Sequence, residues 1–222
     1  MSEPLPIVAR YFDDLPRERI AALSRLCDLV RDWNARINLI SRKDIAHLEE
    51  HHLLHSLAAA KVWKPAAGST AVDLGSGGGF PGLPLAIVFP ECRFTLVDFV
   101  GKKMKAVQEI VDELSLENVR IVRDRAENLT DRFDYVIGRA VAVLPQFLDW
   151  ALPLVRPGTN GEPGNGVFYF KGSRYRDELA GDPRQPTQVW PLHELFAEDY
   201  FAEKFLLYFP VGVPTSVGPK RA

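Results

Sequence analysis

The fold is decided by residues 72–82, which read VDLGSGGGFPG. A short apolar run at 71–74 leads into the glycines, and a second apolar segment at 83–88 follows them. Gly75 and Gly77 permit a tight turn with positive φ and allow a ligand to approach the backbone closely. In doubly wound α/β domains a glycine turn between a strand and a helix lies at the carboxyl edge of the sheet, where ligands bind. The segment therefore predicts a ligand-binding loop between a buried strand and a helix.

Strands and helices alternate on the C-terminal side of this loop. Apolar patterning predicts strands at 93–97, 119–122, 134–137 and 167–170, and helices at 102–114 and 143–155. This alternation is typical of a parallel sheet with helices on both faces. Residues 205–211 (FLLYFPV) could add a late antiparallel strand at the sheet edge.

Two helices are expected before the first strand. Residues 17–33 place apolar side chains at helical spacing after Pro16, which suits a helix start, and a second helix is expected at 43–61. The predicted organisation is an N-terminal helical extension packed on the core at 1–66, a Rossmann-like domain at 67–213 and a tail at 214–222.

Two carboxylates narrow the class of ligand. Asp98 ends the second predicted strand, where an acidic side chain can accept hydrogen bonds from both hydroxyls of a ribose. Nicotinamide enzymes and S-adenosylmethionine enzymes share this feature. Asp73 separates them, because a carboxylate in the loop would repel a pyrophosphate and attract the α-ammonium group of a methionine moiety. We expect an S-adenosylmethionine-dependent methyltransferase; the alternatives are a nicotinamide enzyme and a non-catalytic α/β domain.

Further candidate site residues follow the later strands. Ala126 and Glu127 come after the third predicted strand and could present backbone groups to an adenine edge, although a solvated carboxylate at a helix start is the alternative for Glu127. Arg139 follows the fourth strand, whose end should face the transferring methyl group. A guanidinium there can hold a phosphate, stack on a base or donate to a base edge, with a surface ion pair as the alternative. Lys171 follows the fifth strand and could also face the substrate.

Composition and cysteine usage bear on compartment and partners. The 222 residues carry a formal net charge of −2, so charge does not announce a nucleic-acid partner, although basic residues cluster at 102–105 and 120–125. Cys27 and Cys92 form no C-x-x-C pair, which favours a reducing compartment. Neither a signal peptide nor an apolar run of about 20 residues is evident, so we expect a cytoplasmic protein with no membrane partner.

A histidine cluster invites comparison with metal sites. His51 and His55 share a helical face in the segment HHLLH (51–55), with His52 between them. The sequence shows no third ligand and lacks the H-E-x-x-H order of zinc metalloproteases. We therefore expect no metal, and interpret the cluster as a helix face near the active site or as ordinary packing.

Taken together, the motifs resemble those of the bacterial ribosomal RNA small-subunit methyltransferase G family, also called the glucose-inhibited division protein B family. The matching pieces run in family order and are WN at 33–34, INLIS at 37–41, HHLLHSL at 51–57, DLGSGGGFPGLP at 73–84, LVDFVGKK at 96–103, RAE at 125–127, RA at 139–140 and KG at 171–172. The resemblance covers about residues 10–210. Phe99 departs from it, because the family often has Ser there, and so does His55, where the family often has Asp.

The resemblance implies a class I S-adenosylmethionine-dependent methyltransferase that acts on N7 of a guanine in 16S (small-subunit) ribosomal RNA. The substrate would be the RNA itself or a ribosomal particle. Independently of the resemblance, we expect a monomer. Guanine N7 has a lone pair and no proton, so the reaction needs no general base, and catalysis would depend on positioning and electrostatics. A small-molecule methyltransferase and a non-catalytic cofactor-binding interaction protein are the alternatives.

The same resemblance assigns roles to the candidate site residues. The expected cofactor-binding residues are Asp73, Gly75, Gly77, Phe80, Asp98, Ala126, Glu127 and Arg139. Of these, Asp73 and Gly75 would hold the methionine end and Asp98 the ribose. Arg139 would also orient the guanine or its phosphate, which makes it the catalytic candidate, and Lys171 would contribute to binding the substrate.

Overall fold

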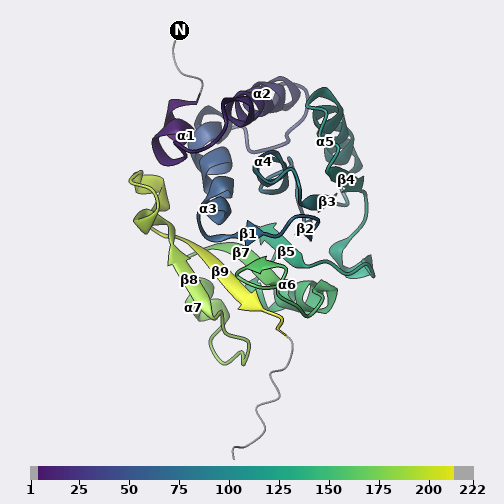
Figure 1. Cartoon of the computed structure of the whole chain (residues 1–222), viewed down its shortest axis with the longest axis vertical. Coiled ribbons are helices and arrows are strands. Elements are labelled where there is room, and N and C mark those ends of the chain that lie inside the picture. The colour runs from purple at the N-terminus through teal and green to yellow at the C-terminus, as the bar shows by residue number, and fades with distance from the viewer. Residues whose placement is uncertain (1–4, 213–222) are drawn as a thin grey trace, which may run out of the picture.

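A seven-stranded, mostly parallel sheet forms the centre of the computed structural model, which describes residues 5–212 (Figure 1). The strand order is β4-β3-β2-β5-β7-β9-β8. The strands are β2 (Thr70–Leu74), β3 (Arg93–Val97), β4 (Val119–Val122), β5 (Tyr135–Arg139), β7 (Gly166–Gly172), β8 (Gln188–Pro191) and β9 (Lys204–Pro210). From β4 to β7 the strands are parallel, whereas β9 is antiparallel to both of its neighbours. The predicted α/β architecture is confirmed.

The late antiparallel strand lies inside the sheet, so the prediction that it forms the edge is wrong. β9 pairs with β7 on one side and with β8 on the other. Leu206 and Tyr208 pack into the apolar core on one face of the sheet, and Leu207 and Phe209 into the core on the other face. Burial on both faces is expected of an interior strand. The edge is formed by β8, which is short and ends in Pro191, a residue type suited to sheet edges.

Helices cover both faces of the sheet (Figure 1). The longer helices on one face are α2 (Arg17–Asn34), α3 (His55–Val62), α4 (Gly82–Val88) and α5 (Gly101–Glu113), joined by the short α1 (Pro6–Tyr11). The other face carries α6 (Leu144–Ala151), the short turn Leu152–Leu154 and α7 (Tyr175–Glu178). Because α1 to α3 share one apolar core with α4 and α5, the expected division at residue 66 stays a prediction. The predicted tail at 214–222 lies outside the described residues.

The segment predicted as one helix at 43–61 is helical but not uniform. It begins with a 3-10 turn, Ile45–His47, continues as a π-helix over Leu48–Leu54 and becomes regular only in α3. π-helical turns are rare and are frequently found at functional sites. Further short elements are the strand pair β1 (Lys64–Pro65) and β6 (Gly161–Glu162), and the 3-10 turns Ala126–Asn128, Leu192–Glu194 and Asp199–Phe201. Among residues 5–212, none of the helices has the length and apolar character needed to span a bilayer.

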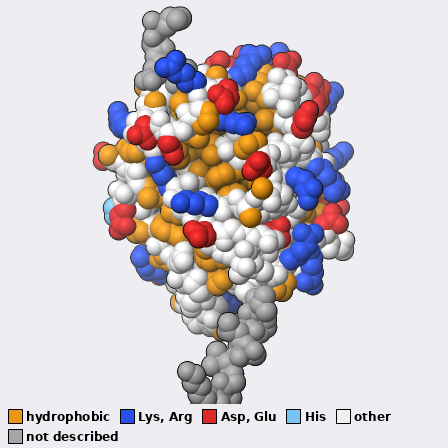
Figure 2. All heavy atoms as spheres, in the orientation of Figure 1, with side chains coloured by type: hydrophobic (Ala, Val, Ile, Leu, Met, Phe, Trp, Pro, Cys, Tyr) orange, Lys and Arg blue, Asp and Glu red, His pale blue; other side chains and the backbone are white. Residues whose placement is uncertain are grey.

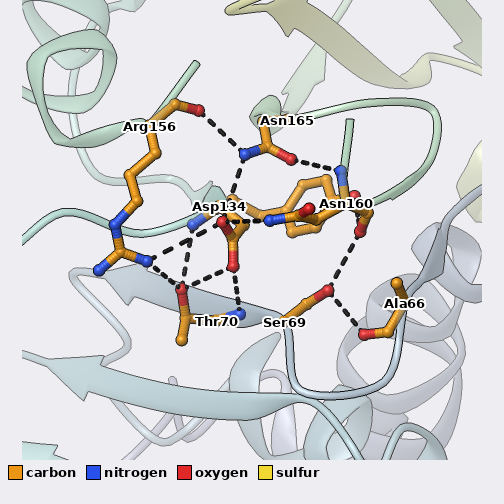
Figure 3. Close-up of polar contacts among 8 residues, drawn as sticks. Ala66, Ser69, Thr70, Asp134, Arg156, Asn160 and Asn165 are labelled. Carbon is orange, nitrogen blue, oxygen red and sulfur yellow. Dashed lines mark hydrogen bonds and ion pairs between the residues drawn. The ribbon is translucent and has the colours of Figure 1, made fainter. Parts of the chain in front are cut away.

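A buried carboxylate, Asp134, joins three segments at the amino end of the sheet (Figure 3). Its Oδ2 accepts hydrogen bonds from the backbone nitrogen and the hydroxyl of Thr70, at 2.8 and 3.0 Å. Its Oδ1 accepts from the side-chain amides of Asn160 and Asn165, at 2.8 and 3.3 Å. Arg156 lies 3.9 Å away and adds a positive charge. The carboxylate therefore fixes the starts of β2 and β5 together with the loop that precedes β7.

We expect Asp134→Ala to lower the free energy of unfolding by about 3–5 kcal/mol, because the buried Asn165 together with Thr70 and Asn160 would lose a shared, buried acceptor. The matched control is Asp131→Ala, which removes an exposed carboxylate 3.4 Å from Arg120 and should change stability by about 0.5 kcal/mol or less. Urea denaturation of both variants measures the difference. Equal, small effects would show that the network contributes little.

Candidate functional site

The carboxyl ends of the parallel strands border a cavity of about 940 Å³. Its lining contains most of the site residues predicted from sequence: Gly75, Gly77, Phe80, Asp98, Ala126, Glu127 and Arg139. Residues 38–43, from the connection between α2 and the π-helix, also line it. Residues 38–41 belong to the INLIS segment of the family resemblance, but no spacing rule or residue type placed them at the site.

The glycine loop between β2 and α4 has the backbone that the sequence predicts. Gly75 has a φ of +68° and Gly77 a φ of +56°, both in the left-handed region that favours glycine. A Cβ atom on Gly75 would also lie only 2.9 Å from the side chain of Val141. Two independent constraints therefore favour glycine at position 75: its left-handed backbone conformation and the close approach of Val141.

Asp98 lies directly after β3 with both carboxylate oxygens engaged by backbone donors. Oδ2 accepts from the nitrogen of Gly77 at 2.9 Å, and Oδ1 accepts from the nitrogen of Val100 at 2.8 Å. These bonds hold the carboxylate rigidly at the cavity wall. Each carboxylate oxygen has more than one acceptor position, so both can still accept a hydroxyl proton.

Asp73 lies beneath the glycine loop and is not among the residues that line the cavity. It is fully buried, and its Oδ2 accepts from the backbone nitrogen of Gly82 at 2.8 Å. Its Oδ1 has no hydrogen-bond partner among the described residues. Burial raises the pKa of this carboxyl to about 7, although the bond from Gly82 and the charge of Arg139 oppose the shift. A direct contact between Asp73 and a ligand therefore stays a prediction.

Arg139 lies on the wall between the first cavity and a second one. The second cavity has a volume of about 610 Å³ and is lined by Arg139, Lys171, Arg174, Tyr200 and Lys204, among others. Lys171 lines only this second cavity, where its ammonium group is 2.6 Å from the carboxylate of Glu178. The structure thus brings the two predicted substrate residues, Arg139 and Lys171, to the second cavity. Arg139 also lines the first cavity.

The guanidinium of Arg139 is held by the histidines of the π-helix. Its Nη2 is 2.8 Å from Nδ1 of His52, and its Nη1 donates to the backbone oxygen of His51 at 3.1 Å. Asp44 bridges both histidines, with Oδ2 2.8 Å from Nε2 of His52 and Oδ1 2.7 Å from Nδ1 of His51. The sequence assigned no chemical role to these residues. The available signal was the position of Asp44, seven and eight residues before the pair.

Two departures from the family pattern have clear surroundings. His55 is buried, and its Nδ1 lies 3.1 Å from the hydroxyl of Tyr200. Phe99 lines the first cavity with 61% of its surface exposed, and the guanidinium of Arg125 lies 5.3 Å from its ring centre. Within residues 5–212, no group of three or more acidic, histidine and cysteine side chains is arranged to hold a metal ion.

We expect Asp73→Asn to become more stable relative to wild type as the pH rises from about 5 to about 8, in cofactor-free protein. The folded-state pKa of about 7 exceeds that of an unfolded aspartate, about 3.9. The contribution of Asp73 to the free energy of unfolding is therefore complete below about pH 4, and it is lost as the pH rises through about 7. At about 1.4 kcal/mol for each pKa unit the difference amounts to a few kcal/mol. Urea denaturation across this pH range measures it; a pH-independent difference would contradict the assignment.

Comparison with known proteins bears on the family. The family described as rRNA small subunit methyltransferase G (GidB) matches residues 19–194. The ribosomal RNA small subunit methyltransferase G of Flavobacterium psychrophilum is 42% identical over 204 residues, covering 92% of this chain and 97% of that protein. The protein of the same description from Bacteroides thetaiotaomicron is 41% identical over 204 residues, covering 92% of this chain and 98% of that protein.

Solved structures share the fold at much lower sequence identity. A SAM-dependent methyltransferase from Aquifex aeolicus matches with a TM-score of 0.57 at 14% identity, covering 78% of this chain and 99% of that chain. An rRNA methylase from Streptococcus thermophilus matches with a TM-score of 0.51 at 14% identity, covering 72% of this chain and 95% of that chain. These likenesses confirm the predicted Rossmann-like fold of class I methyltransferases. With a family match over residues 19–194 and relatives above 40% identity, the chain belongs to the rRNA small subunit methyltransferase G family.

Proposed function

We propose that this protein transfers the methyl group of S-adenosylmethionine to N7 of a guanine in 16S ribosomal RNA. Membership of the family establishes an S-adenosylmethionine-dependent enzyme that acts on small-subunit ribosomal RNA. The observation that carries the finer proposal is the arrangement of the two cavities. One contains the glycine loop and Asp98, the other contains Lys171, and the guanidinium of Arg139 lies on the wall between them.

The first cavity suits an adenosine-containing cofactor. The rigid carboxylate of Asp98 would accept hydrogen bonds from the ribose hydroxyls. Ala126 and Glu127, which line the cavity after β4, would flank the adenine. The methionine end would lie along the backbone of Gly75 and Gly77. When bound, S-adenosylmethionine supplies an electrophilic methyl group on a sulfonium.

Asp73 would act on the cofactor from beneath the loop rather than from the cavity wall. Its carboxylate holds the nitrogen of Gly82, the first residue of α4. It also lies close enough to Arg139 for the two charges to influence each other. In this role Asp73 would fix the loop that carries Gly75, and its negative charge would favour the positively charged methionine end.

The chemistry makes few demands on acid–base catalysis. Guanine N7 carries a lone pair and no proton, so the protein has no proton to remove. The positive charge of the sulfonium passes to the base, so the work left to a positioned guanidinium such as Arg139 is to orient the guanine, by donating to its edge or to its phosphate. Lys171 would assist on the substrate side of the same wall.

Surface charge supports an RNA substrate. Lys and Arg side chains gather along the side of the molecule that carries α5 and β4 (Figure 2). The sequence clusters at 102–105 and 120–125 belong to these two elements and their connections. Such side chains would contact phosphates and contribute affinity that falls with salt. We propose that the protein acts as a monomer in the cytoplasm, on an exposed guanine of free RNA or of a ribosomal particle.

The proposal predicts one N7-methylguanine in 16S ribosomal RNA that is present in cells with the gene and absent in cells without it. Mass mapping of nuclease fragments of the RNA locates the modification, and purified protein with free RNA or with small-subunit particles identifies the substrate form. No difference between the two RNA samples would overturn the proposal. Turnover of metabolites without RNA would indicate a small-molecule methyltransferase.

We expect Asp98→Ala to weaken binding of S-adenosylmethionine and of its demethylated product by about 10- to 100-fold, or about 1.5–3 kcal/mol, the scale of hydrogen bonds to a charged group. Calorimetric titration measures both affinities, and circular dichroism checks the fold. The matched control is Asp112→Ala, which removes an exposed carboxylate from α5. A folded Asp98 variant with unchanged affinity would remove Asp98 from the ribose site.

A further inference from the structure

A chain of polar contacts runs from Asp44 through His52 to Arg139, inside the wall that separates the two cavities. We propose that His52, supported by Asp44, is a positioning residue that sets the orientation of the Arg139 guanidinium for methyl transfer. His52 would act through Arg139. The inference rests on the proposed function, because it assumes that Arg139 faces the reacting groups.

The direction of each hydrogen bond follows from the chemistry of the partners. A guanidinium only donates, so Nδ1 of His52, 2.8 Å from Nη2, must be the unprotonated acceptor. The ring proton of neutral His52 is then on Nε2, which donates to Oδ2 of Asp44 at 2.8 Å. Asp44 therefore selects the one neutral tautomer of His52 that can accept from Arg139.

The protonation states needed for this chain are favoured by the surroundings. Burial and the charge of Arg139 lower the pKa of His52 to about 4, although Asp44 opposes the shift, so the ring is neutral near pH 7. Burial alone would raise the pKa of Asp44, but hydrogen bonds from His51 and His52 outweigh it and hold that pKa below its usual value. The acceptor at Nδ1 is thus maintained under ordinary conditions.

The remaining contacts of Arg139 show why His52 sets its orientation. Nη1 donates to a backbone oxygen, that of His51. The ring of Phe80 lies 5.9 Å from the guanidinium carbon, a distance that allows only a weak cation–π contact. Among the described residues, His52 is the one side chain that accepts a hydrogen bond from Arg139. Two of the five N–H donors of a guanidinium are then engaged, which leaves the others for ligands in either cavity.

A matched pair of substitutions tests the acceptor. His52→Leu removes it, whereas His52→Asn places an amide oxygen near the position of Nδ1. We expect His52→Leu to lower turnover of ribosomal RNA at saturating cofactor by roughly 10- to 100-fold, and His52→Asn to recover most of that loss. His193→Leu, which changes an exposed histidine in the turn Leu192–Glu194, is the control and should leave turnover at the wild-type level. A folded His52→Leu with wild-type turnover, or a His52→Asn no better than His52→Leu, would overturn the proposal.

A double-mutant cycle separates positioning from a general structural effect. Arg139→Ala alone should lower turnover by roughly 30- to 1000-fold. If His52 acts through Arg139, adding His52→Leu to Arg139→Ala should slow the enzyme little further, because the two effects are not additive. Independent effects that multiply would contradict the proposal. Circular dichroism and cofactor titration accompany each variant.

Asp44→Ala provides a second route if His52→Leu does not fold, since Asp44 is partly exposed and we expect its truncation to disturb packing less. It should lower turnover, and this effect too should disappear in the Arg139→Ala background; persistence there would overturn the proposal. The assay of the wild-type protein distinguishes a failure of the proposed function from a failure of the role proposed for His52. Wild-type protein that does not methylate small-subunit ribosomal RNA refutes the proposed function, whereas an active wild type with multiplying effects refutes only the role of His52.

Discussion

The site depends on a hydrogen bond that is itself out of reach of any ligand. The backbone nitrogen of Gly82 donates to the buried carboxylate of Asp73 at 2.8 Å. Asp73 belongs to β2 and Gly82 opens α4, so this bond joins the two ends of the glycine loop. With both ends fixed, the backbone between them has little freedom, and Asp98 holds its middle through the nitrogen of Gly77. Two buried or half-buried carboxylates thus shape a loop whose own residues carry no charge.

Sheet topology then decides what surrounds that loop. β2 lies between β3 and β5, and the chain reaches these neighbours in opposite directions along the sheet. Open α/β sheets bind ligands at such a reversal, outside the carboxyl ends of the strands. Asp98 follows β3 on one side of the loop, and Arg139 ends β5 on the other. The residues that would bind the cofactor and those that would meet the substrate are therefore separated by a single strand.

Sequence reasoning succeeded where local pattern determines structure. The strands around the glycine loop are short apolar runs bounded by turn residues, and their carboxyl ends converge because they are parallel. Predictions from sequence were wrong or incomplete where contacts between distant segments determine the structure. The position of β9 inside the sheet depends on β8, a four-residue strand containing Pro191 that has almost no pattern of its own. The contact of His52 with Arg139 spans 87 residues, and no spacing rule connects them. It was not predictable either that Asp73 does not line the cavity. Alternation along β2 predicts the face of the sheet on which a side chain lies, but not the path of the loop above it.

The separation of His52 and Arg139 along the chain also means that the two residues are synthesised at different times. A nascent chain that ends just after β3 already contains the glycine loop and Asp98, but the strand that supplies Arg139 has not yet been made. Until β5 inserts beside β2, the side-chain hydrogen bonds of the histidine pair within its own segment go to Asp44. Elements for holding a donor molecule are synthesised first, and the group that would act on the acceptor comes later.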